Sequence, residues 1–117
     1  MSSMETGSSF AAREAFGCEV RSDGDVVRVE AFGALDMATV PRLRERIAEL
    51  RDGGCRRFIV DLRRLAFMDS SGLRLMLELS AEARRDGISV GIVPGGPAIQ
   101  RVFEITGTME LLPFVSS

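Results

Sequence analysis

Several residue types with useful chemistry are missing from this sequence. Histidine, tryptophan and tyrosine are absent, and all 15 basic residues are arginine, so there is no lysine either. Without histidine there can be no Ser-His-Asp triad and no histidine ligand for zinc. Without lysine there can be no Schiff base and no Gly-Lys-Ser/Thr nucleotide loop. The composition argues against an enzyme, and we expect no catalytic residue, no metal and no cofactor.

The sequence also lacks a long apolar run and a strong net charge. No segment approaches the ~20 apolar residues that span a bilayer. The net charge is −2 and the pI is about 5.2. The arginine clusters are balanced by nearby acidic residues and have no interleaved aromatic side chains. We therefore predict that the protein binds neither nucleic acid nor membrane.

Cysteine is scarce as well. Cys18 and Cys55 lack the Cys-x-x-Cys spacing of a zinc or redox motif. The first nine residues have neither the basic start nor the apolar core of a signal peptide. These features predict a cytoplasmic protein with two reduced thiols. The alternative is a Cys18–Cys55 disulfide that acts as a redox switch, which requires the two Cα atoms to lie within ~7 Å.

What is present fits one globular domain. The chain has 117 residues, of which 45% are hydrophobic and 27% charged. This length can bury a core without a disulfide or a metal. The Ser- and Gly-rich start predicts a disordered leader over residues 1–14, followed by the domain over residues 15–117.

Hydrophobic spacing predicts alternating strands and helices. Apolar runs on both sides of an Asp-Gly turn predict a hairpin, steps of three and four predict helices, and short apolar runs predict buried parallel strands. Strands are predicted over residues 16–21, 26–32, 58–62, 88–93 and 111–115, and helices over 39–51, 71–85 and 97–106. The order ββαβαβαβ indicates an α/β fold: a mostly parallel sheet with an N-terminal antiparallel hairpin and helices packed on it.

Two loops are predicted at the carboxyl ends of strands, where ligands and reactive groups gather in α/β sheets. One is the Gly-Ala-Leu-Asp run at 33–36, and the other is the Phe-Met-Asp-Ser-Ser-Gly run at 67–72. The simplest interpretation of the second run is a helix N-cap. The functional interpretation is that one serine carries a phosphate, which a helix N-terminus tolerates. A nucleophilic serine is a poor third option, because no histidine or lysine can act as its base.

Two further features resemble phosphate chemistry without matching it. The Gly-rich run at 93–97 precedes a helix but lacks the Gly-Lys-Ser/Thr ending, so we interpret it as a strand-to-helix turn. Asp61 is placed like the phospho-accepting aspartate of a receiver domain. The chain has neither the acidic pair nor the lysine that receivers also use. We therefore interpret Asp61 as a solvated strand end or a local cap.

The motifs resemble a known family. The segment at 59–73, in which a strand ending in Asp-Leu is followed by Phe-Met-Asp-Ser-Ser-Gly-Leu, is similar to the signature of STAS domains of the anti-sigma factor antagonist (anti-anti-sigma factor) type. Residues 33–36 resemble the family's Gly-x-Leu-Asp element, and residues 99–107 resemble its third helix. The resemblance covers roughly residues 17–114 and implies the STAS fold.

What the resemblance implies is a partner-switching regulator with no catalytic step of its own. Unphosphorylated, such a protein binds an anti-sigma factor that is also a serine kinase and thereby frees a sigma factor. The kinase switches it off by phosphorylating a serine, and a serine phosphatase reverses the modification. By alignment of the motif, the phosphorylated residue is Ser70, and the partner-binding residues are Asp36, Asp69, Ser70, Ser71 and Gly72.

Two alternatives to this function stay open. One is a STAS scaffold that is never phosphorylated, such as a subunit of a transporter or signalling complex, and the other is an antagonist switched by Cys18 and Cys55. Family members usually continue into a fourth helix, and this sequence stops at Ser117. We therefore expect that helix to be missing, the apolar face of the first helix to be less covered, and the exposed region to support weak self-association.

Overall fold

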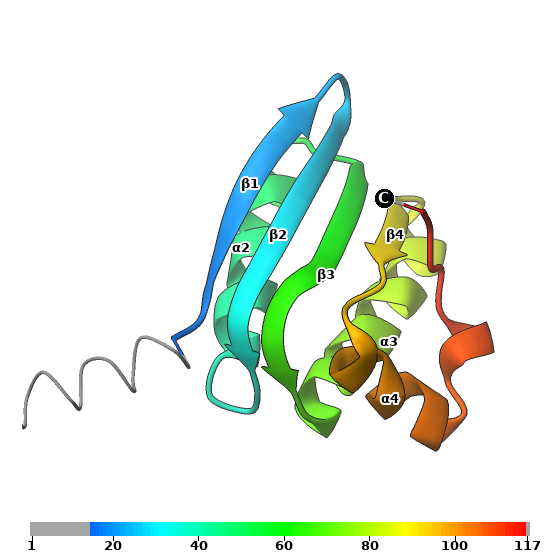
Figure 1. Ribbon diagram of the computed structural model, residues 1–117. Coiled ribbons are helices and arrows are strands. Elements are labelled where there is room, and N and C mark those ends of the chain that lie inside the picture. Colours follow the sequence, from blue (N-terminus) through cyan, green and yellow to red (C-terminus); the bar gives the residue numbers. More distant parts are fainter. Residues whose placement is uncertain (1–14, 117) are drawn as a thin grey trace, which may run out of the picture.

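The computed structural model describes residues 15–116 and contains a four-stranded sheet with the order β1-β2-β3-β4 (Figure 1). β1 is antiparallel to β2, while β2, β3 and β4 are parallel to one another. The elements in chain order are β1 (Gly17–Asp23), β2 (Val26–Leu35), α2 (Val40–Asp52), β3 (Arg57–Met68), α3 (Ser70–Asp86), β4 (Ser89–Val93), α4 (Pro97–Thr106) and the short 3-10 helix η1 (Met109–Leu111). The predicted α/β class, with an antiparallel hairpin leading a parallel sheet, is confirmed.

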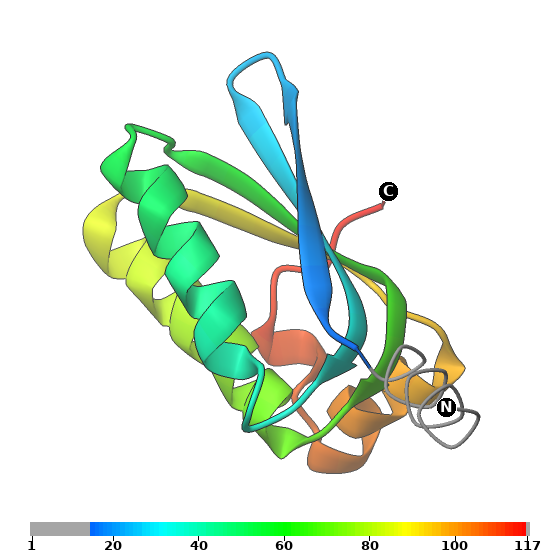
Figure 2. The same cartoon turned by 90° about the vertical axis from the view of Figure 1, so that its left-hand side faces the viewer.

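α2 and α3 cover the same face of the sheet. Each connects two neighbouring parallel strands, and right-handed crossovers place both helices on one side. Figure 2 shows them lying side by side. Arg44 of α2 pairs with Glu78 and Glu82 of α3, and Arg51 pairs with Glu82 and Asp86. Partly exposed pairs contribute ~1 kcal/mol or less each, so the apolar core beneath the helices does most to hold them.

This core lies between the sheet and the two helices and extends to α4, which contributes Phe103. Its fully buried side chains are Phe58, Phe103, Leu35, Leu43, Leu62, Leu75, Met76, Ile92, Val29, Val60 and Val93. Each contributes roughly 1.5–3 kcal/mol by leaving water. The apolar face of α2 is well covered, since Leu43 is 0% exposed and Ile47 is 4% exposed. The expectation of a less covered first helix is therefore wrong, because the sheet and α3 bury that face.

β2 and β3 are longer than predicted, because their pairing continues through two irregularities. From Glu30 to Phe32 the register advances by two residues on β2, but from Asp61 to Arg64 it advances by three on β3. A second extra residue of β3 follows before residue 67. Such bulges interrupt the alternation of side chains and bend the strand. The predicted strand ends at residues 32 and 62 are therefore wrong, and the strands extend to residues 35 and 68.

Asp61 lies at the first of these bulges and is buried, not solvated. It is 2% exposed, and its carboxylate accepts hydrogen bonds from the Arg63 backbone N–H at 3.0 Å, the Arg63 guanidinium at 2.7 Å and the Arg28 guanidinium at 3.0 Å. Burial by itself raises the pKa of Asp61, but the hydrogen bonds and charge of Arg63, together with Arg28, outweigh it and hold the pKa below its usual value. The interpretation as a solvated strand end is wrong because β3 continues and two arginines cover the carboxylate.

The predicted last strand is reduced to a single parallel bridge between Phe114 and Ile92. Part of its range forms η1 instead. Pro113 has no N–H to donate to a ladder, although its carbonyl accepts from the Ile92 N–H at 2.9 Å. The Val115 N–H donates to the Ile92 carbonyl at 2.8 Å and completes the bridge. Because Pro113 cannot donate a further bond to β4, the ladder does not extend in that direction.

The leader predicted over residues 1–14 lies outside the described residues. Within residues 15–116, no helix is long and apolar enough to cross a membrane. The same residues contain no cluster of three or more cysteine, aspartate and glutamate side chains that could hold a metal ion.

Candidate functional site

The two predicted loops lie next to each other, where β2 and β3 end (Figure 1). Leu35 and Met68, the last residues of these strands, are register partners. The N–H of Asp69 donates to the carbonyl of Leu35 at 3.2 Å and ties the two strand ends together. The chain continues from one end into the turn before α2 and from the other into α3. The structure therefore places Asp36 and Ser70 at the same edge of the sheet.

Gly33 gives the Gly-Ala-Leu-Asp run a specific backbone shape. Its φ is +85°, which L side chains rarely adopt, and a Cβ there would lie 1.4 Å from the carbonyl oxygen of Ala15. The glycine lets the segment entering β1 pass close against β2. This run therefore has a structural reason for its glycine, and it carries Asp36 to the site edge.

Asp36 organises the turn before α2. Its Oδ1 accepts hydrogen bonds from the N–H groups of Ala38 at 2.9 Å and Thr39 at 3.1 Å. The Thr39 hydroxyl in turn donates to the carbonyl of Ala34 at 2.7 Å. This is an Asx-type turn, which holds a carboxylate in a defined orientation. Within residues 15–116, the hydrogen bonds of the Asp36 carboxylate are all made by Oδ1, and Oδ2 makes none.

Asp69 is the N-cap of α3, with its Oδ1 accepting from the Ser71 N–H at 2.8 Å. Ser70 is the first residue of α3 and is exposed, while Ser71 beside it is half-buried. Because Asp69 performs the capping, the helix does not need the serine hydroxyls for this purpose. In the described part of the chain the Ser70 hydroxyl forms no hydrogen bond.

Gly72 sets the distance between α3 and the strand ends. It is buried, and a Cβ on it would lie 2.4 Å from Met68 Cγ and 3.1 Å from Leu35 Cδ2. The first turn of α3 therefore packs against the ends of both strands with its backbone. The structure gives Gly72 a packing role, and its contact with a partner stays a prediction.

Two exposed apolar side chains at this edge were not among the predicted site residues. Met37 is 78% exposed in the turn after Asp36, and Phe67 is 52% exposed near the end of β3. Singly exposed apolar side chains are common on protein surfaces, so what distinguishes these two is their position in the chain beside Asp36 and Ser70. The sequence does contain a signal for these two residues, because Met37 directly follows Asp36 and Phe67 lies two residues before Asp69. Their exposure, however, depends on the strand register.

The two cysteines are free thiols in the structure. Cys18 pairs with Ala31, whereas Cys55 precedes Phe58, which pairs with Val27. Val27 and Ala31 are separated by about 13 Å along β2 at ~3.3 Å per residue, and Cys55 lies further in that direction. The Cα separation exceeds the ~7 Å that a disulfide permits. Burial also raises the pKa of the Cys18 thiol, which lowers the fraction of reactive thiolate. An intramolecular redox switch does not fit this arrangement.

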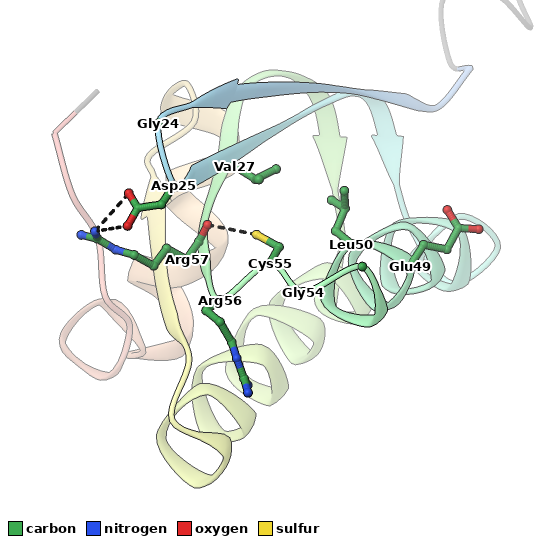
Figure 3. A pocket seen from close by; sticks show the side chains of 10 residues that line it. Gly24, Asp25, Val27, Glu49, Leu50, Gly54, Cys55, Arg56 and Arg57 are labelled. Carbon is green, nitrogen blue, oxygen red and sulfur yellow. Dashed lines mark hydrogen bonds and ion pairs between the residues drawn. The ribbon is translucent and has the colours of Figure 1, made fainter.

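A hollow of about 600 Å³ lies where β3 begins, whereas Ser70 follows the other end of that strand. Figure 3 shows the residues that line the hollow. It is bordered by the β1–β2 turn, the end of α2 and the segment entering β3. Arg57 pairs with Asp25 at 3.2 Å, and the Cys55 thiol donates to the Arg57 carbonyl at 3.4 Å. These groups satisfy one another, and none of the predicted site residues lines the hollow.

The fold and the paired ends of β2 and β3 agree with a comparison of the sequence with known protein families. The family model that describes the STAS domain matches residues 18–117. The chain belongs to the STAS domain family, which confirms the resemblance seen in the motif.

Individual proteins of this family that resemble the chain are named anti-sigma factor antagonists. An anti-sigma-B factor antagonist of Staphylococcus aureus is 32% identical over 94 residues, which cover 80% of this chain and 87% of that protein. An anti-sigma factor antagonist from Mycobacterium paratuberculosis matches with a TM-score of 0.74 and 25% identity over 89% of this chain and 88% of that chain. The anti-sigma factor antagonist SpoIIAA, a Bacillus cell fate determinant, is 27% identical over 88% of this chain. Its unphosphorylated form gives a TM-score of 0.69 over 88% of that chain, and its phosphorylated form gives 0.65 over 91%. These three relatives are all named anti-sigma factor antagonists.

Proposed function

We propose that this protein is an anti-sigma factor antagonist that switches partners in the cytoplasm. Unphosphorylated, it binds an anti-sigma factor that is also a serine kinase, and a sigma factor is released. The proposal depends mainly on the position of Ser70. It is the exposed first residue of α3 and lies, with Asp36, where β2 and β3 end. Similarity to the S. aureus antagonist supports the partner class, and similarity to phosphorylated SpoIIAA supports the modification.

The modification is a phosphoryl transfer to the Ser70 hydroxyl. A bond forms between Ser70 Oγ and the γ-phosphorus of ATP, while the bond from that phosphorus to the departing ADP oxygen breaks. The hydroxyl proton passes to a base of the kinase, the role that an aspartate of the catalytic loop has in protein kinases. A serine phosphatase reverses the step by hydrolysis and releases inorganic phosphate. The chain is the substrate of both reactions.

The phosphate acts by its charge. A phosphoserine carries about −1.5 to −2 charges, and the carboxylates of Asp36 and Asp69 lie at the same edge. Burying this charge in the centre of a protein contact that supplies no counter-charge costs several kcal/mol. A loss of about 3–4 kcal/mol weakens binding several-hundred-fold. This is sufficient to release the kinase.

The contact surface in this proposal combines the acidic edge with the two exposed apolar side chains. Met37 and Phe67 flank Asp36 and Ser70 along the chain, and both are more than half exposed. A central apolar anchor surrounded by polar groups is the usual arrangement of an interface hot spot. Phe67 is the stronger anchor because an aromatic ring buries a large area at a low entropy cost.

Paired baits test the proposal. Ser70→Ala and Ser70→Asp are immobilised and exposed to native lysate, and Ser22→Asp serves as the matched control, because it adds the same charge at an exposed position of β1. We expect Ser70→Ala and Ser22→Asp to capture a protein with a serine kinase domain and Ser70→Asp to lose it. The captured kinase with ATP should modify Ser70, as mapped by mass spectrometry. Equal capture by both Ser70 variants, or modification at another residue only, would overturn the proposal. Capture of transporter subunits would instead support the unphosphorylated scaffold.

A further inference from the structure

An arginine follows Ser70 one helical turn later. Ser70 and Arg74 are four residues apart in α3, and both are exposed. Residues at this spacing lie on the same side of a helix, with Cβ atoms roughly 5–6 Å apart. The long side chain of Arg74 can therefore reach an anion attached to Ser70 Oγ.

The same helix contains a second pair with this spacing. Arg84 Nη1 donates to the Ser80 hydroxyl oxygen at 3.2 Å, again across four residues of α3. An arginine of this helix thus reaches a serine oxygen one turn toward the N-terminus without any distortion of the backbone. Ser80 is 6% exposed, so a kinase cannot use it, and Arg84 provides an internal control for Arg74.

Among residues 15–116, Arg74 has no ionic partner. Glu78, the acidic residue one turn further on, is paired with Arg44 of α2. A cation near the N-terminus of a helix is slightly unfavourable because the helix dipole is positive there. The position of Arg74 therefore contributes little to the fold until an anion is placed beside it.

Two other charged groups at this edge, those of Asp69 and Asp36, are acidic. The carboxylates of Asp69 and Asp36 already accept backbone N–H groups, and both repel a phosphate on Ser70. We propose that Arg74 is a positioning residue of the phosphorylated state, whose guanidinium pairs with the phosphate on Ser70. This inference rests on the proposed function, since it assigns a further residue to the same switch. The pair holds the phosphate over the first turn of α3 and withdraws a cation from the partner surface.

The experiment installs phosphoserine at position 70 during synthesis, so that it does not depend on any kinase. The ³¹P resonance is titrated in the otherwise unchanged chain, in Arg74→Gln, in Arg74→Lys and in the control Arg84→Gln. We expect the titration midpoint to rise by roughly 0.15–0.4 pH unit in Arg74→Gln, because an exposed helical ion pair is worth about 0.2–0.5 kcal/mol and one pKa unit corresponds to about 1.36 kcal/mol. Arg84→Gln should leave it unchanged and Arg74→Lys should retain most of the effect. In 1 M salt the difference should shrink, because the Debye length falls to ~3 Å.

An unchanged midpoint in Arg74→Gln, or an equal rise in Arg84→Gln, would overturn the inference. Circular dichroism verifies that each variant is folded. A failure of the kinase to modify Ser70 would overturn the proposed function, whereas the installed phosphate would still report on Arg74. The two failures are therefore distinguishable.

Discussion

Replacing Gly72 with alanine measures how tightly α3 is seated on the strand ends. The added Cβ would lie 2.4 Å from Met68 Cγ, 2.9 Å from Met68 Sδ and 3.1 Å from Leu35 Cδ2. Met68 is 4% exposed and Leu35 is 0% exposed, so neither side chain can move into solvent. The helix, the strand end or both must shift.

Two opposing contributions determine the size of the effect. Alanine is more favourable than glycine within a helix by about 1 kcal/mol. Overpacking a buried site costs typically ~1–3 kcal/mol, and contact with an inner side-chain atom at 2.4 Å places Gly72→Ala near the upper end. We expect a net loss of about 1–2 kcal/mol in the free energy of unfolding, which lowers Tm by roughly 4–10 °C.

Urea unfolding followed by far-UV circular dichroism is the suitable assay, because the chain has no tryptophan or tyrosine to report by fluorescence. Gly53→Ala is the matched control: φ is −80° and the nearest atom to an added Cβ is 3.5 Å away. Gly53→Ala should leave the free energy of unfolding unchanged or raise it slightly. In a Met68→Ala background, Gly72→Ala should cost less than it does alone. A Gly72→Ala protein as stable as its parent would refute the packing argument.

Three other predictions follow from the same structure. Because the pKa of Asp61 is lower in the folded chain than its usual value of 3.8, this residue stabilises the fold above that pH and ceases to do so as the pH falls through the lowered pKa. Asp61→Asn should therefore lower the free energy of unfolding by about 1–3 kcal/mol at pH 7. Urea titrations should show that this difference from the parent vanishes at strongly acidic pH, and a difference independent of pH would contradict the prediction. Gly33→Ala should have a Tm well below that of the parent in a thermal scan, because φ of Gly33 is +85° and the Ala15 carbonyl oxygen occupies the position that the added Cβ would take. Phe67→Ala should retain the parent's Tm and lose at least tenfold in affinity for the captured kinase by calorimetry, and unchanged affinity would remove Phe67 from the interface.

The helices were predictable because their signals are local. Apolar stripes, the capping aspartate and glycine stops gave 39–51 and 71–85, against Val40–Asp52 and Ser70–Asp86 in the structure. The strand ends were not predictable from alternation, since the two bulges of β3 interrupt it. Those bulges depend on the neighbouring strand and on the arginines around Asp61, which a single segment of sequence does not reveal.

The candidate site divides in a similar way. The Asp-Ser-Ser-Gly run and the Gly-Ala-Leu-Asp run are readable as motifs, and parallel strand order explains why their ends meet. The structural role of each residue cannot be predicted from the motif, because that role depends on contacts between segments that are distant in the sequence. Only the structure distinguishes Asp69 as the cap, Gly72 as a packing residue and Ser70 as the free hydroxyl. The exposure of Met37 and Phe67 likewise results from the register.

The most direct test of the switch is the affinity of two chemically defined forms for the purified kinase-type anti-sigma factor. Isothermal titration calorimetry compares the unmodified chain with the chain that carries phosphoserine at position 70. We predict that the phosphate weakens binding several-hundred-fold, the equivalent of about 3–4 kcal/mol, and that removal of the phosphate restores it. Equal affinity of the two forms would contradict the account.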